Sequence, residues 1–157
     1  KSGNNHPILA PYGLFKSSDG EVAVAPASDK FCVIFLECIE LSDLLNQEIY
    51  KDNENRMKNR QSLNDIINKK MKLETSDYWI KKLNDAGCPA AKVASLPEAL
   101  DSQLIKDTEM VITSSGPEGR RIKMTGFPVK LSETPAQLYR SPPLLGQHTE
   151  EVLKNIK

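Results

Sequence analysis

The sequence predicts an α/β fold in two parts. A small domain over residues 1–107 packs a short β-sheet with helices, and an extended segment over residues 108–157 follows it. In the first part, short β-leaning runs alternate with stretches of helical periodicity, whereas the second part is rich in proline. The length of 157 residues suits a small domain with an extension. Only 39% of the residues are hydrophobic and 6% aromatic, so we expect the chain to pack against more protein.

A β-hairpin and a helix come first. Residues 12–16 and 21–25 are β-leaning, and a turn ending at Gly20 separates them. Pro26 ends the second strand. Ser28 or Asp29 can then accept the free amides at the start of a helix that runs to about Ile39.

Further helices and a strand complete the small domain. We expect a helical turn over residues 41–46, one long helix over 53–72 with basic outer faces, a helix over 77–86 capped by Ser76 and ended by Gly87, and a strand over 91–94. Each longer helix has an apolar stripe at spacings of three and four. These stripes are Phe31, Ile34, Phe35 and Cys38; Leu63, Ile66, Ile67 and Met71; and Trp79, Ile80 and Leu83.

The second part begins after a short helix whose start is a capping box, Ser95 to Glu98. Residues 110–113 and 121–125 are predicted strands, joined by a turn over residues 115–119. The chain from Phe127 onward is extended, and His148 or Thr149 caps a last helix. We expect the His148 imidazole to bond local backbone there, not to act in catalysis.

Composition excludes several classes of partner and site. Lys plus Arg and Asp plus Glu both number 21, so nothing in the charge balance favours nucleic acid or an anionic membrane. No apolar run reaches the roughly 18 residues that a membrane span needs. Cys32, Cys38 and Cys88 lack metal-ligand spacing, so we predict no metal site and three buried, reduced thiols in a cytoplasmic protein.

Several motifs occur in an order that together resembles a known family. They are Asn5-His6-Pro7 with Pro11-Tyr12-Gly13; Asp19-Gly20; Asn55-Arg56 with Asn59-Arg60; Trp79 with Leu83; Ala86-Gly87-Cys88-Pro89; Gly126-Phe127-Pro128 with Leu131-Ser132-Glu133-Thr134-Pro135; and Pro142-Pro143-Leu144-Leu145-Gly146-Gln147-His148-Thr149. In this combination the chain resembles the C-terminal part of a family III CoA-transferase, also called the CaiB/BaiF or carnitine dehydratase-like family.

The resemblance implies a fold and an activity. The fold is the small α/β domain of that family plus the segment that returns to a large Rossmann-like domain, in an interlocked homodimer. The activity is transfer of CoA between carboxylic acids through an acyl-aspartyl intermediate, with acyl-CoA and carboxylic acids as partners and no cofactor beyond the CoA thioester. The catalytic Asp of the family lies upstream of the matched part, and the chain starts at Lys1 without an initiator Met. We therefore expect no catalytic residue in this chain and no activity from it alone.

The resemblance also indicates where substrate would be met. In formyl-CoA transferase-like members a glycine-rich loop closes over the active site, and Gly3, Asn4, Asn5 and His6 occupy its place here with a single glycine. Arg56 and Arg60 match family positions that would brace the small domain.

Two alternatives stay open. Racemases of the same superfamily, which act on 2-methylacyl-CoA, carry a catalytic Glu at the position of Ser28, with Asp29 adjacent; a serine hydroxyl is too weak a base for that reaction. The chain could also be a non-catalytic interaction fragment. In either case Leu131, Leu138, Leu144 and Leu145 of the tail are expected to be disordered or buried against another copy.

Overall fold

The computed structural model describes residues 3–116 and 119–156, and it divides the chain into two compact units, Lys1–Val93 and Ala94–Lys157. The sequence placed the change of character later, after residue 107. Lys1 and Ser2 of the expected loop and Pro117 and Glu118 of the expected turn lie outside the described residues.

The first unit contains a three-stranded antiparallel sheet in the order β1-β2-β3. Its strands are β1 (Gly13–Lys16), β2 (Glu21–Val24) and β3 (Ala90–Lys92). The predicted hairpin is confirmed as β1 and β2, and the third strand begins one residue earlier than expected and ends at Lys92. In the register, Leu14 lies opposite Ala23, and Ala23 lies opposite Ala91.

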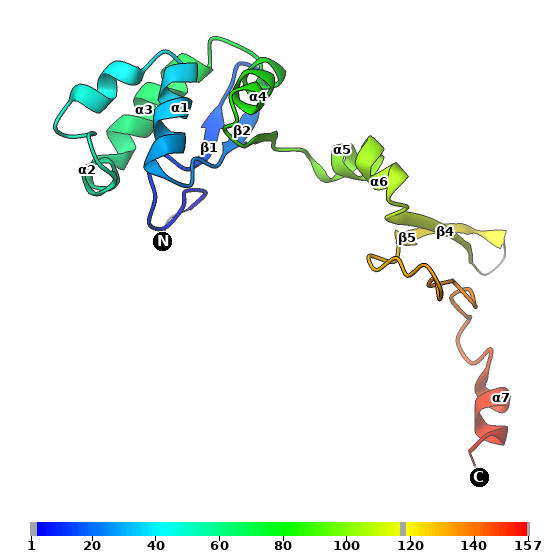
Figure 1. The fold of residues 1–157 in the computed structure, drawn as a ribbon. Coiled ribbons are helices and arrows are strands. Elements are labelled where there is room, and N and C mark those ends of the chain that lie inside the picture. Colours follow the sequence, from blue (N-terminus) through cyan, green and yellow to red (C-terminus); the bar gives the residue numbers. More distant parts are fainter. Residues whose placement is uncertain (1–2, 117–118, 157) are drawn as a thin grey trace. The chain divides into compact units, whose positions relative to one another are not determined.

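Helices cover one face of this sheet (Figure 1). They are α1 (Asp29–Cys38), α2 (Asn53–Lys58), α3 (Arg60–Met71) and α4 (Ser76–Asp85), with the 3-10 helix η1 (Ser42–Asn46) after α1. Ser28 caps α1 as expected. The cap of α4 is Thr75, not Ser76. The Ser76 hydroxyl donates instead to Asp19, which ties the hairpin turn to the start of α4.

The predicted long helix over residues 53–72 is two helices that meet at Asn59. Asn59 has φ −106° and ψ 22°, outside the helical range. Its side-chain amide donates to the Asn55 and Ile49 carbonyl oxygens, at 2.9 and 3.2 Å. A side chain that bonds backbone carbonyls in this way competes with the regular helix and interrupts it.

The core of the first unit lies between the helices and the sheet. Phe15 and Phe35 pack with ring centroids 5.5 Å apart, and Trp79 donates its indole N–H to the Met71 carbonyl at 2.7 Å. The predicted stripes of α3 and α4 supply Leu63, Ile67, Met71, Trp79 and Leu83 to this core. The stripe predicted for α1 is wrong except at Phe35, because its Phe31, Ile34 and Cys38 are only partly buried and α1 buries Cys32 and Leu36 instead. The fully buried side chains of the core include Phe15, Val22, Val24, Phe35, Leu36, Ile39, Leu63, Ile67, Met71, Leu83 and Cys88. Arg56 lies apart from the solvated basic face of α2 and α3 and is only 2% exposed, in keeping with the bracing position that the family resemblance implied.

The second unit consists of short elements. They are α5 (Leu96–Asp101), α6 (Gln103–Asp107), the antiparallel pair β4 (Val111–Ser115) and β5 (Arg121–Thr125), and α7 (Thr149–Lys154). The predicted capping box is confirmed, because Ser95 and Glu98 bond each other's backbone amides. Among the described residues of this unit, no large hydrophobic side chain is buried.

His148 occupies the position just before the last helix, as expected, but its imidazole does not bond the backbone there. The His148 Nδ1 lies 3.5 Å from a carboxylate oxygen of Glu151, which also pairs with Arg140. No helix within residues 3–116 and 119–156 is long and apolar enough to cross a membrane.

Candidate functional site

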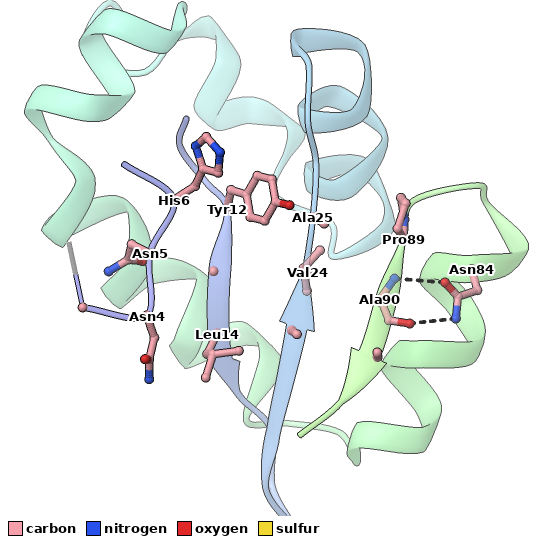
Figure 2. Close-up of a pocket in the computed structure, with 14 residues that line it drawn as sticks. Asn4, Asn5, His6, Tyr12, Leu14, Val24, Ala25, Asn84, Pro89 and Ala90 are labelled. Carbon is pink, nitrogen blue, oxygen red and sulfur yellow. Dashed lines mark hydrogen bonds between the residues drawn. The ribbon is translucent and has the colours of Figure 1, made fainter. Parts of the chain in front are cut away.

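A groove of about 570 Å³ in the first unit is the candidate site (Figure 2). The N-terminal loop and Tyr12 form one side of it, and Pro89 and Ala90 with the end of α4 form the other. The ends of β1 and β2 lie between these two sides.

The floor of the groove is apolar and belongs to the sheet face that the helices leave uncovered. Side chains alternate along a strand, so Phe15, Val22 and Val24 point into the core while Leu14 and Ala23 point to the other face. The register places Leu14, Ala23 and Ala91 side by side across three strands. Small side chains at two of these three positions leave room above the sheet for a ligand.

The rim carries all four residues that the family resemblance indicated. Gly3, Asn4, Asn5 and His6 each line the groove. The His6 amide donates to the Tyr12 carbonyl at 2.9 Å, and the two rings stack with centroids 4.6 Å apart. The His6 Nδ1 accepts the Ile8 amide at 3.3 Å. In the neutral ring, Nε2 therefore carries the proton and is the free donor.

Gly13 allows the loop to lie against the start of β1. Asn5 forms an isolated antiparallel bridge with Gly13. A Cβ atom at Gly13 would lie 2.7 Å from the Asn4 carbonyl oxygen and 2.9 Å from the Asn5 side-chain oxygen. Glycine is the residue that permits such a close approach of backbone, which gives a physical reason for the Pro11-Tyr12-Gly13 motif.

The far side of the groove is fixed by Asn84. Its side-chain oxygen accepts the Ala90 amide and its side-chain nitrogen donates to the Ala90 carbonyl, both at 3.0 Å (Figure 2). This two-point bond joins the last turn of α4 to the first residue of β3. No sequence pattern marks Asn84, because a lone asparagine near the end of a helix gives no signal of such a role.

The groove offers polar donors but no carboxylate. Among the described residues that line it there is no Asp, Glu, Lys or Arg. The cysteines do not supply a nucleophile either, because burial raises the pKa of both Cys32 and Cys88 to about 11 and keeps those thiols protonated near neutral pH. Burial also raises the pKa of Cys38, which is half-buried and not fully buried as expected.

Ser28 and Asp29 lie away from this groove, beside a smaller cavity of about 220 Å³. The Ser28 hydroxyl accepts the Phe31 amide as a helix cap, and the Asp29 carboxylate pairs with Arg56. Both side chains therefore have structural partners. No group of His, Cys, Asp and Glu side chains suited to holding a metal ion occurs in the part of the chain that the structure describes.

Comparisons with known proteins agree on one family. The family model described as CoA-transferase family III matches residues 1–149. The chain is 32% identical over 154 residues to a succinyl-CoA:mesaconate CoA-transferase of Haloarcula hispanica, covering 98% of this chain and 38% of that protein. It is 26% identical over 154 residues to the succinyl-CoA:glutarate CoA-transferase of Homo sapiens, covering 98% of this chain and 35% of that protein.

A solved structure has the same fold. The crystal structure of a CaiB/BaiF family protein from Brucella suis superimposes with a TM-score of 0.78 at 23% identity, over 98% of this chain and 39% of that one. The chain thus spans a little over a third of the length of each of these three proteins.

Proposed function

The chain belongs to CoA-transferase family III, and from that premise we propose that it forms the C-terminal part of an enzyme that transfers CoA from an acyl-CoA to a carboxylic acid. The proposal concerns the whole protein, because the chain corresponds to 35–38% of the curated relatives described above. Those relatives are named for succinyl-CoA with glutarate or mesaconate. We take a short dicarboxylic acid as the first acceptor to test.

The observation that carries the proposal is the composition of the groove. Its floor, Leu14, Ala23 and Ala91, suits the carbon chain of an acyl group, and Asn4 and His6, which can donate hydrogen bonds, lie at its rim. Donors of this kind stabilise the oxyanion that develops when a thioester carbonyl is attacked. None of the described residues that line the groove is a carboxylate that could attack the thioester.

We place that attacking group outside these residues, as an aspartate. A carboxylate oxygen would bond to the thioester carbonyl carbon, the CoA thiolate would leave, and a mixed anhydride would form. This reaction uses the CoA thioester as substrate and needs neither a metal nor a redox cofactor. The three free thiols fit a cytoplasmic protein, and the exposed leucines of the tail fit the interface of a homodimer.

Two further readings have less support. A racemase would need a base at Ser28, whose hydroxyl caps α1 beside a different cavity. A purely interacting fragment would not need donors gathered at the rim of an apolar groove.

The test uses a protein of the relatives' length that carries these residues, supplied with succinyl-CoA and glutarate. We expect glutaryl-CoA to accumulate, and we expect none with the 157-residue chain alone. His6→Ala should lower kcat/KM by roughly 100-fold, the scale for loss of one oxyanion donor, whereas the control His148→Ala in the second unit should retain activity. An unchanged kcat/KM in His6→Ala would contradict the proposal that the donors at the groove stabilise the oxyanion.

A further inference from the structure

Four polar side chains form one stripe along α2 and α3. Asn53, Arg56, Arg60 and Asn64 follow one another at intervals of three, four and four, which places them on one helical face. The interruption at Asn59 lies between the second and third of them and does not break the stripe, because the Leu63 amide still donates to the Asn59 carbonyl at 3.1 Å.

Every member of this stripe forms a hydrogen bond with residues 5–10, the segment that begins in the loop at the groove. The Asn53 side-chain nitrogen donates to the Ile8 carbonyl at 2.9 Å, and the Asn53 side-chain oxygen accepts the Ala10 backbone amide at 3.1 Å. Arg56 Nε donates to the Ala10 carbonyl at 2.7 Å. Arg60 donates to the Leu9 carbonyl at 3.1 Å, and Asn64 donates to the Asn5 side-chain oxygen at 3.0 Å.

Arg56 anchors the stripe to the body of the unit. Its guanidinium also donates to the Tyr50 carbonyl at 3.2 Å and pairs with Asp29 at the start of α1. Arg56 as a residue is only 2% exposed, and a buried guanidinium has little freedom to move once its donors are used. The segment bonded to it is held against a rigid support.

We infer that Asn53, Arg56, Arg60 and Asn64 are positioning residues that hold residues 5–10 and thereby fix the His6 ring at the groove. The link to His6 passes through one residue: the Ile8 carbonyl is held by Asn53, and the Ile8 amide donates to His6 Nδ1. The bond to Nδ1 selects the Nε2–H form of the neutral ring. The catalytic consequence rests on the proposed function, but the positioning itself does not.

A substitution at Asn64 should loosen the loop with little loss of stability. The Asn64 side-chain oxygen is buried and has no hydrogen-bond partner among the described residues. An unsatisfied buried acceptor is costly, so a leucine of similar size at this position should cost little stability while it releases Asn5. Asn68, one turn further along α3, offers a matched control, because its side-chain oxygen accepts the Lys16 amide in β1 at 2.8 Å and not a group of residues 5–10.

The test measures the loop and the ring in the 157-residue chain. Amide hydrogen exchange at His6, Ile8 and Ala10 should be about tenfold faster in Asn53→Leu, the effect of losing one hydrogen bond of ordinary strength. Asn64→Leu should speed exchange at His6, and Asn68→Leu should leave all three amides unchanged. The ring ¹⁵N shifts of His6 should move from the Nε2–H form toward a tautomer mixture in Asn53→Leu.

His148 serves as the internal reference for the ring shifts, since the chain has two histidines. If Asn53→Leu does not fold, Asn53→Asp at this first helical position keeps the acceptor for Ala10 and removes the donor to Ile8. Unchanged exchange and unchanged His6 shifts in the folded Asn53 variant and in Asn64→Leu would overturn the inference.

Activity distinguishes this inference from the proposed function. In the longer protein, Asn53→Leu should lower kcat roughly ten- to a hundredfold with a smaller change in KM, as expected for a displaced group at the reacting centre. If Asn53→Leu loosens the loop but kcat is unchanged, the inference about positioning stands. The catalytic role proposed for the loop is then contradicted.

Discussion

In the first unit, Trp79, Phe15 and Leu36 are buried, whereas in the second unit Tyr139 is 85% exposed and Leu145 is fully exposed. Both units nevertheless contain well-formed local elements. Ser28 caps α1 in one, and the Ser95–Glu98 capping box starts α5 in the other.

This difference separates two sources of structure. Caps, turns and strand pairing act over a few residues and form the elements of both units. Burial of apolar side chains supplies most of the stability of a domain. Within the described chain, large apolar side chains are fully buried only in the first unit, whereas those of the second unit, such as Ile112 and Ile122, are at most partly buried. We therefore expect the first unit to be the more stable of the two, and the second to depend more on local elements than on a core.

The largest expected effect is in the core of the first unit. Trp79→Ala empties a large buried volume and removes the indole N–H that donates to the Met71 carbonyl, so it should lower the free energy of unfolding by about 3–5 kcal/mol. Chemical denaturation of the chain measures this. The control is Tyr78→Ala, because Tyr78 is 43% exposed and touches Trp79 in an edge-on ring contact, so its loss should cost much less. Equal losses in the two variants would mean that Trp79 is not a core anchor.

A smaller and strictly local effect is expected in the second unit. A Cβ at Gly126 would collide with the Glu109 carbonyl, so Gly126→Ala should cost about 1–3 kcal/mol in the β4–β5 pair. Amide exchange at residues 111–125 should accelerate while the amides of α1 and α3 stay protected. Simultaneous loss of protection in both units would show that they unfold together, and it would contradict the expected difference in stability between them.

The hairpin turn of the first unit adds a pH dependence. Hydrogen bonds from Ser76, first from its hydroxyl and then from its amide, lower the pKa of Asp19 to about 2 from its usual value near 3.8. Because the folded pKa is the lower one, the stabilisation is complete above about pH 4 and is lost as pH falls toward 2. Thermal melting of the wild type and Asp19→Asn should therefore differ most near neutral pH and converge at low pH. A constant difference from pH 7 to pH 2 would exclude this role.

The smallest effect is expected where the tail is most exposed. Leu145→Ser should change the unfolding free energy of the 157-residue chain by less than about 0.5 kcal/mol, because a fully exposed side chain loses no contact. A loss above about 1 kcal/mol would show that Leu145 already packs against protein, either its own chain or a second copy.

Much of the fold follows from local signals in the sequence. The hairpin around Gly20, the cap at Ser28 and the helix end at Gly87 all depend on neighbouring residues, and the structure has each of them. The interruption at Asn59 could not be found in that way. Asn59 interrupts the helix by reaching the Ile49 carbonyl, and helical periodicity contains no information about that loop.

The groove, like the fold, has parts that the sequence indicates and parts that it does not. Its rim could be indicated from the family resemblance of Asn5-His6-Pro7 and Gly13. Its floor depends on the strand register that brings Ala91 beside Ala23, and its support depends on bonds between residues about 45 to 60 positions apart, such as Asn64 to Asn5. The spacing of Asn53, Arg56, Arg60 and Asn64 was a visible signal, but on a helix rich in lysine it resembles an ordinary solvated face.

The most direct test of the whole account is to locate the acyl group during turnover. The longer protein is incubated with a radiolabelled succinyl-CoA, the reaction is quenched, and the modified peptide is identified by mass spectrometry. We predict a labelled aspartate outside the residues of this chain, and no label on the 157-residue chain treated in the same way. A label on any carboxylate between Asp19 and Glu151 would contradict the account.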